Sequence, residues 1–331
     1  MTTKRYIDAV REGAARMSVG GTDEGAVSGF VKLGGRLLII KERAVYEVLL
    51  ADSIDPERTN PDIPNAHQRI LSIGSESQLL GRTLLTADRL LDQQFFPPTI
   101  NCDSARQSAL DVALHLAAVA DDVGKLEEET VRAFQGLAGS HAKHSFTLPS
   151  ISGLEAKCKA SFHRAHDSIK SSMDIARVFY GKSITHPDSL DAYLRSKGSE
   201  PDELLAWLAG SLAPLSRIWQ WRNAVVHPKD NEKMLVSDFR LMPSGQFAPP
   251  SIEIRHPTVP QTSTPASNLL RDVLDEVSAS FEGLLAFLCA SNAQFGKFQL
   301  AISDLPADRR KYPHARYAYF TNLGDQFAPI G

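Results

Sequence analysis

The stretch Pro214–Pro228, PLSRIWQWRNAVVHP, is a helix-length run of residues enclosed by two prolines. Proline is well tolerated in the first turn of a helix. The residue before a proline is pushed out of the α region, so a helix usually ends there. The stretch therefore predicts a helix over 214–226 with its most polar residues in the last turn.

Helical patterns lie on both sides of this stretch. Residues 153–179 place apolar side chains at spacings of 3, 4 and 7, residues 202–212 predict a shorter helix, and residues 265–291 repeat Leu, Val and Phe at helical spacing. Between them, residues 234–255 alternate apolar and polar positions around a Met-Pro-Ser-Gly turn, which indicates a hairpin. The prediction is an all-α bundle with a small β-hairpin insertion.

The whole chain divides into four parts on this reading. A helical N-terminal region covers 1–138, a Gly-, Ser- and His-rich linker covers 139–152, a helical domain with the hairpin near 234–255 covers 153–292, and a C-terminal tail covers 293–331. The predicted helices of the first part cover residues 5–17, 36–53, 76–95, 103–120 and 124–138.

Composition narrows the class of protein. The 331 residues carry a net charge of −3, and 43% are hydrophobic. No apolar run approaches the roughly 20 residues of a membrane helix, the N-terminus lacks the apolar core of a secretory signal, and the three cysteines form no CxxC pair. We expect a cytoplasmic protein with no membrane contact and no disulfide framework. Residues 139–200 hold nine Lys/Arg against six Asp/Glu, which is where a polyanion site is first expected.

Arg222, Asn223 and His227 form the pattern R-N-x-x-x-H, followed by Pro228. Arg222 continues the apolar stripe of its helix and should be partly sheltered. It lies about 140° around an ideal helix from His227, so the two side chains do not meet in a regular helix. Pro228 loosens the last turn and lets His227 leave helical geometry.

These three residue types suit RNA cleavage without a metal or other cofactor. A histidine can move a proton to or from a 2′-hydroxyl near neutral pH, and an arginine fork matches phosphate oxygens. Asn223 would orient either group. The expected reaction is internal attack by the 2′-hydroxyl, which leaves a 2′,3′-cyclic phosphate.

The motif late in a helix of a helical domain resembles the signature of HEPN domains. The resemblance covers about 153–292 and implies a helical bundle that forms a homodimer, with Arg222, Asn223 and His227 as the motif residues. Many HEPN proteins are metal-independent ribonucleases of toxin–antitoxin or anti-phage defence systems, so an RNA substrate and an antitoxin or other protein partner are implied. One toxin branch has Tyr two residues after the His, where this chain has Lys229.

Two alternatives remain open. The domain could be a non-catalytic dimerisation or partner-binding module, in which Arg222 and His227 only satisfy the end of their helix. It could also bind a nucleotide without cleaving RNA. An open cleft at the motif would favour catalysis, and burial of the motif under 1–138 would favour the interaction module.

Two further groups are candidate RNA-binding residues. The first is a basic stripe at helical spacing, which a solvated helix face would also explain: Lys159, His163, His166 and Lys170. The second lies in the aromatic-rich tail, whose aromatic residues could equally dock onto the body: Arg309, Arg310 and Arg316. No metal site is expected, because neither His163 nor His166 has an acidic or cysteine partner at a suitable spacing.

Overall fold

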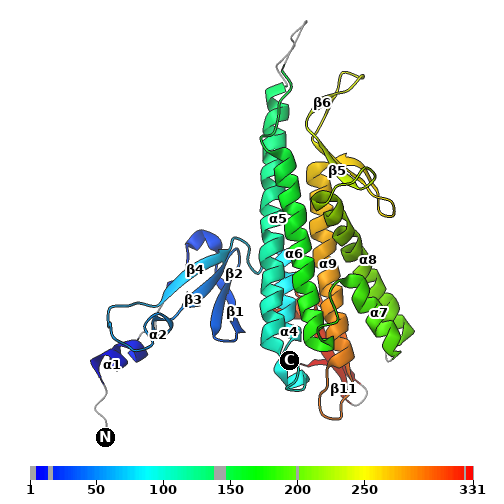
Figure 1. Cartoon of the computed structure of the whole chain (residues 1–331). Coiled ribbons are helices and arrows are strands. Elements are labelled where there is room, and N and C mark those ends of the chain that lie inside the picture. Colours follow the sequence, from blue (N-terminus) through cyan, green and yellow to red (C-terminus); the bar gives the residue numbers. More distant parts are fainter. Residues whose placement is uncertain (1–4, 14–17, 138–146, 199–200, 324–325, 331) are drawn as a thin grey trace.

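The computed structural model describes residues 5–13, 18–137, 147–198, 201–323 and 326–330. A bundle of long helices carries a four-stranded sheet on one side and smaller sheets at both ends (Figure 1). The prediction of an all-α fold is therefore wrong, because the described residues form a mixed α and β structure.

Four long helices build the bundle: α5 (Cys102–Leu137), α6 (Leu154–Tyr180), α8 (Asp202–Val226) and α9 (Ala266–Asn292). All four contribute to one apolar core, whose buried residues include Leu116, Phe162, Leu215 and Phe281. Complete burial of a side chain of this size contributes about 1.5–3 kcal/mol. The shorter α7 (Pro187–Lys197) packs against α8.

The predicted helices at 153–179 and 265–291 are confirmed by α6 and α9. The predicted pairs 103–120 with 124–138, and 202–212 with 214–226, are each one continuous helix, with Pro214 inside α8. A proline inside a helix removes one hydrogen bond. Here Leu212, Leu215 and Ile218 are buried on both sides of it, and that packing outweighs the local cost.

The interval predicted as a linker connects two helices that share the core. Residues 138–146 lie outside the described part of the chain, and residues 147–150 form no helix or strand. α5 and α6 pack along each other from either side of this interval. The apolar core thus contains residues from both of the regions that the sequence separates at 139–152.

An antiparallel sheet replaces one of the helices predicted in the N-terminal region, the one at 36–53. Its order is β1 (Val27–Leu33), β2 (Arg36–Lys41), β3 (Val45–Leu49) and β4 (Ala66–Leu71). The predicted helix at 36–53 is wrong: its Ile and Val residues fit a pleated sheet, and only α2 (Ala51–Ile54) is helical. Gly34 has φ +56°, so the Gly34-Gly35 pair forms a tight turn between β1 and β2.

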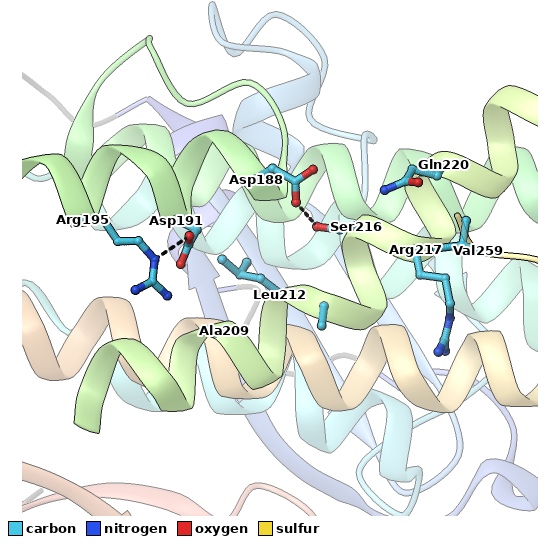
Figure 2. Close-up of a pocket in the computed structure, with 10 residues that line it drawn as sticks. Asp188, Asp191, Arg195, Ala209, Leu212, Ser216, Arg217, Gln220 and Val259 are labelled. Atoms are coloured by element: carbon cyan, nitrogen blue, oxygen red, sulfur yellow. Dashed lines mark hydrogen bonds and ion pairs between the residues drawn. The ribbon is translucent and has the colours of Figure 1, made fainter. Parts of the chain in front are cut away.

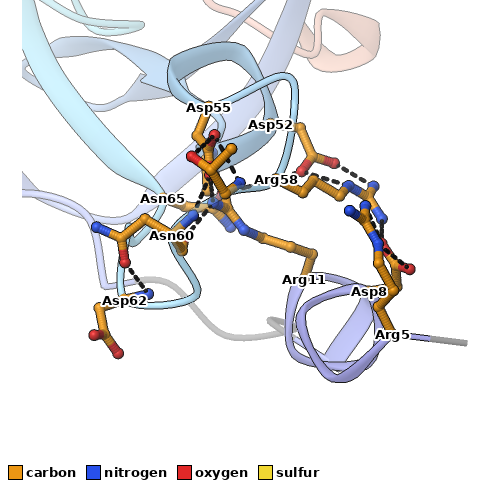
Figure 3. A network of polar contacts seen from close by, with 11 residues as sticks. Arg5, Asp8, Arg11, Asp52, Asp55, Arg58, Asn60, Asp62 and Asn65 are labelled. Atoms are coloured by element: carbon orange, nitrogen blue, oxygen red, sulfur yellow. Dashed lines mark hydrogen bonds and ion pairs between the residues drawn. The ribbon is translucent and has the colours of Figure 1, made fainter.

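Ion pairs fasten the first helix, α1 (Tyr6–Gly13), to the loop that follows α2 (Figure 3). Arg11 is 4% exposed and its Nη2 lies 3.2 Å from Asp55 Oδ2. Arg58 Nη1 lies 2.9 Å from Asp8 Oδ1, and its Nη2 lies 2.7 Å from Asp52 Oδ2. The hydrogen bonds from Arg5 and Arg58 lower the pKa of Asp8 to about 2. A short 3₁₀ turn, η1 (Thr22–Glu24), then leads into β1.

A distorted helix connects the sheet to α5. It consists of α3 (Gln78–Leu80), a π-helical turn η2 (Gly81–Leu85) and α4 (Thr86–Leu90), followed by a 3₁₀ turn η3 (Gln93–Phe95). Thr86 Oγ1 donates to the carbonyl of Gly81 at 2.7 Å. π turns occur often at functional sites. η2 packs against both α5 and α9.

The predicted hairpin near 234–255 is confirmed, because β5 (Lys233–Ser237) pairs with β8 (Ser251–Arg255). Its extension contains the short pair β6 (Arg240–Leu241) and β7 (Phe247–Ala248). β9 (Gln261–Pro265) adds a third strand to β5 and β8 and leads directly into α9.

The C-terminal tail is a second small sheet at the opposite end of the bundle (Figure 1). It consists of β10 (Leu300–Asp304), β11 (Tyr317–Leu323) and β12 (Gln326–Ile330), with a 3₁₀ turn η4 (Ala307–Arg309) after β10. Two of the tail's aromatic side chains, Tyr312 and Tyr319, are buried against the body. Phe320 is buried with Leu305 and Ala318 of the tail itself. Tyr319 donates its hydroxyl to the carbonyl of Leu90 at 2.8 Å.

None of the helices in the described residues has the length and apolarity that crossing a membrane requires.

Candidate functional site

The R-N-x-x-x-H motif lies at the C-terminal end of α8. The helix ends at Val226, and His227 leaves helical geometry with φ −124° and ψ 62°. Its backbone N–H still donates to the carbonyl of Asn223 at 2.8 Å. Asn223 is half-buried and the imidazole of His227 is exposed. His227 thus leaves helical geometry, as Pro228 predicts, and it is exposed to solvent.

Arg222 and His166 come together across the contact between α8 and α6. Arg222 is half-buried, and its Nε is buried without a hydrogen-bond partner among the described residues. His166 is 7% exposed, and its ring lies 4.2 Å from the ring of Trp219. Burial lowers the pKa of His166, and the Arg222 charge lowers it further, while Asp167 opposes the shift. His166 is therefore a neutral imidazole at neutral pH.

The four residues of the basic stripe on α6 differ in their burial and in their ion pairs. His163 and Lys170 are exposed, whereas His166 is buried, and Lys159 pairs with Glu155 at 2.6 Å. The stripe is not one uniform cationic surface. Its member next to the motif is His166, and Lys170 contributes to lowering the pKa of that histidine. We call the group Arg222, Asn223, His227, His166 and Trp219 the motif face.

The motif face offers two imidazoles in different settings and a fixed cation. A neutral imidazole can accept a proton, and an exposed imidazole at a helix end can exchange one with a ligand. The half-buried guanidinium of Arg222 has five donors in a fork that suits a phosphate. Of the sequence-predicted catalytic residues, Arg222 is the one whose charge acts on a predicted RNA-binding residue, His166.

A cavity of about 370 Å³ lies between α7 and α8, one turn before the motif (Figure 2). Some of its polar groups are paired: Arg195 Nε lies 2.7 Å from Asp191 Oδ2, and Ser216 donates to Asp188 at 2.5 Å. Arg217, at the other end, pairs with Glu276. Asp191 Oδ1 and Arg217 Nε, both on residues that line the cavity, are buried without a hydrogen-bond partner among the described residues. None of the motif residues lines the cavity.

The three tail arginines have different environments. Arg309 is exposed at the end of η4. Arg310 donates from Nε to the carbonyl of Leu305 at 2.7 Å and from Nη1 to that of Pro313 at 3.2 Å. Arg316 pairs with the buried carboxylate of Glu282, Nη2 to Oε2 at 2.9 Å. Only Arg310 and Arg316 are held in fixed positions.

Arg310 and Arg316 line a second cavity of about 170 Å³, which we call the arginine cavity. Four other residues complete it: Gln78, Arg82, Pro313 and His314. Arg82 is not predictable as a site residue from the sequence, because its position depends on the π turn, for which the sequence carries no periodic signal. The lack of a side chain at Gly81 allows the π turn to approach His314 closely, since an added Cβ at Gly81 would lie 2.4 Å from the Cβ of His314.

The cysteines do not supply a nucleophile. All three are buried. Burial raises the pKa of Cys102 to about 11 and that of Cys158 to about 12, and it raises the pKa of Cys289 as well. Since the thiolate is the reactive form, these thiols are unreactive at neutral pH.

Comparison with protein-family models, curated proteins and solved structures finds no match for this chain. The resemblance to HEPN domains therefore rests on the motif and stays a prediction.

Proposed function

We propose that the motif face binds RNA and cleaves it without a metal ion. The observation that carries the proposal is the placement of Arg222 beside the buried, neutral His166, with the exposed His227 on the same helix end. A fixed cation, a proton acceptor and a second imidazole are the groups that such a reaction requires. The defence or toxin role that the HEPN resemblance implies belongs to the same proposal.

The proposed reaction is a transesterification within the RNA. One imidazole takes the proton of a 2′-hydroxyl, and the 2′-oxygen attacks the adjacent phosphorus. The bond from phosphorus to the 5′-oxygen breaks, and the leaving oxygen receives a proton from the other imidazole. Arg222 steadies the negative charge on the phosphate, and such preorganised donors are often the largest single contribution to catalysis. The products are a 2′,3′-cyclic phosphate and a 5′-hydroxyl.

We also propose that two copies of the chain form the working site. Within one chain Arg222 and His227 point about 140° apart on an ideal helix, whereas an isologous dimer can place His227 of one copy beside Arg222 of the other. Mixing the Arg222→Gln and His227→Ala variants would then restore part of the activity. A fully active monomer would contradict the dimer.

The test is incubation of the purified chain with labelled transfer and messenger RNA in excess chelator. We expect cleavage with cyclic-phosphate ends in the wild type and loss of cleavage in Arg222→Gln. Arg195→Gln is the matched control, because it removes an arginine of α7 that pairs only with its own helix and should keep full activity.

A folded wild type that cleaves no RNA would end the nuclease proposal. If Arg222→Gln and His227→Ala then also disrupt dimerisation or partner binding, the interaction module is favoured instead.

A further inference from the structure

The arginine cavity brings together three separate parts of the chain. Arg82 comes from the π turn η2, while Arg310 and Arg316 come from the segment between β10 and β11, on opposite sides of His314. Glu282 of α9 pairs with Arg316 and is fully buried. The cavity is remote in sequence from the motif face and lies on the side of α9 that contacts η2.

Two of the three guanidinium groups are held in place by the protein. Arg316 Nε lies 3.2 and 3.1 Å from the two carboxylate oxygens of Glu282, in addition to its Nη2 contact. Two backbone carbonyls hold Arg310, and its Nη2 lies 3.7 Å from Asp304 Oδ1. Arg316 Nη1 also lies 3.9 Å from Asp304 Oδ2. Prepositioned donors bind a ligand without losing further side-chain freedom.

Arg82 is the least satisfied of the three. Its polar contacts within the described ranges are long: Nη1 to Ser278 Oγ at 3.5 Å, and Nε to Glu282 Oε2 at 3.9 Å. Its side chain is only 21% exposed. A guanidinium has five N–H donors, so most of the Arg82 donors have no acceptor among the described residues and remain accessible to a ligand in the cavity.

Charge and size define what the cavity can take. The three arginines outnumber the two nearby carboxylates, Glu282 and the half-exposed Asp304, so the local balance favours an anion. Sites for drug-sized molecules occupy about 300–1,000 Å³, and this cavity has about 170 Å³. It therefore fits a small, multiply charged group. Arginine forks match phosphate oxygens two at a time.

We infer that the arginine cavity binds a terminal phosphate group, with Arg82 as the main donor to the ligand and Arg310 and Arg316 as the flanking donors. The group could be inorganic phosphate, the phosphate of a mononucleotide or the phosphorylated end of an RNA, because all present the same terminal oxygens. The inference is independent of the proposed cleavage reaction, which uses other residues.

The experiment is calorimetric titration of the full chain with inorganic phosphate, adenosine 5′-monophosphate, and a short RNA with or without a 5′-phosphate. Acetate serves as a singly charged comparator. We expect saturable binding of phosphate that is tighter than that of acetate. A preference for the nucleotide or for the 5′-phosphorylated RNA identifies the source of the phosphate.

Arg82→Gln should weaken phosphate binding about tenfold or more, because hydrogen bonds to charged groups are stronger than neutral ones. Arg82→Lys keeps the charge but loses the fork and should fall in between. The matched control is Arg132→Gln on α5, an exposed arginine that pairs with Glu128 and should bind phosphate like the wild type.

Melting temperatures without ligand distinguish lost binding from lost folding. If Arg82→Gln melts early, the comparison rests on Arg82→Lys alone. Absence of saturable phosphate binding in the folded wild type would overturn the inference. Equal affinities in Arg82→Lys, Arg132→Gln and the wild type would also overturn it.

Discussion

The motif face and the arginine cavity are both cationic, but they are assembled differently. Three of the five residues of the motif face fall within Arg222–His227. The other two are Trp219 on α8 and His166 on the neighbouring helix α6. The arginine cavity joins Arg82 to Arg316 across more than two hundred residues. Residues that form a motif within one helix can be recognised in the sequence. Residues that only tertiary packing brings together can be recognised only in the folded structure.

The largest expected effect would test the motif face directly. Removing a positioned acid–base group costs about 10² to 10⁴-fold in rate. We therefore expect His227→Ala to lower RNA cleavage by this factor. Arg222→Gln removes a donor that stabilises charge and should lower cleavage about 10² to 10³-fold. Since His227 is exposed, its removal should shift unfolding free energy by no more than about 0.5 kcal/mol. Cleavage assays and denaturant titration of the same variants give both quantities, and a large stability loss in His227→Ala would indicate a structural role.

The second effect would show whether the arginine cavity is also a structural centre. Glu282→Ala leaves the Arg316 side chain without its buried partner, and breaking a buried ion pair costs about 3–5 kcal/mol. Arg316 is 39% exposed, so solvent can compensate part of this, and the lower end of the range is expected. Urea unfolding measures it. Glu276→Ala, at a half-exposed pair with Arg217, is the control and should cost far less.

The third effect examines the close contact that shapes the cavity. Gly81→Ala would place a methyl group 2.4 Å from the Cβ of His314. Overpacking of this kind costs about 1–3 kcal/mol, and phosphate binding should weaken as the segment around His314 moves. Gly124→Ala in α5 meets nothing within 4 Å and should stabilise its helix by about 0.5–1 kcal/mol. Similar effects in the two variants would contradict the close approach.

The smallest expected effect is on the pH dependence of the unfolding free energy, through His166 of the motif face. The pKa of His166 is lowered by burial and by Arg222, so the unfolded chain binds a proton there more readily than the folded chain. The stability contribution of neutral His166 is complete above its ordinary pKa of about 6.5 and is lost as the pH falls below that value. Unfolding titrations between pH 7.5 and 5 should therefore show a smaller decline in His166→Gln. An equal decline in unfolding free energy in the wild type and in His166→Gln would show that groups other than His166 cause the loss of stability at low pH.

The helical half of the fold could be predicted from sequence because its signal is local and periodic. The apolar spacing in 153–179 and 265–291 marks α6 and α9 almost to their ends. The motif's position at a helix end follows in the same way from Pro228, and the partial shelter of Arg222 follows from the apolar stripe that it continues.

The N-terminal sheet and the C-terminal sheet are not predictable from the sequence pattern, for two physical reasons. Residues 36–53 have no Gly or Pro within them, which suggested a helix, but Gly34-Gly35 before them is a hairpin signal. Pairing of β1 with β2 then buries Leu38 and Ile40. In the tail, each strand is stable only beside the others, so tertiary pairing decides the structure. The π turn that positions Arg82 has no sequence signature of its own.

The hydroxyl of Tyr319 donates to the carbonyl of Leu90, and this contact limits when the core can form during synthesis of the chain. A ribosome extends a chain at about 5–20 residues per second and releases its N-terminal part first. The end of α4 would therefore wait roughly 10–50 seconds for the strand that covers it. Until then, Leu90 and Phe95 lack the Tyr319 ring that packs 4.2 Å from Phe95 in the finished protein. The part of the core around Leu90 and Phe95 is therefore complete only after Tyr319, more than two hundred residues later in the chain, has been synthesised.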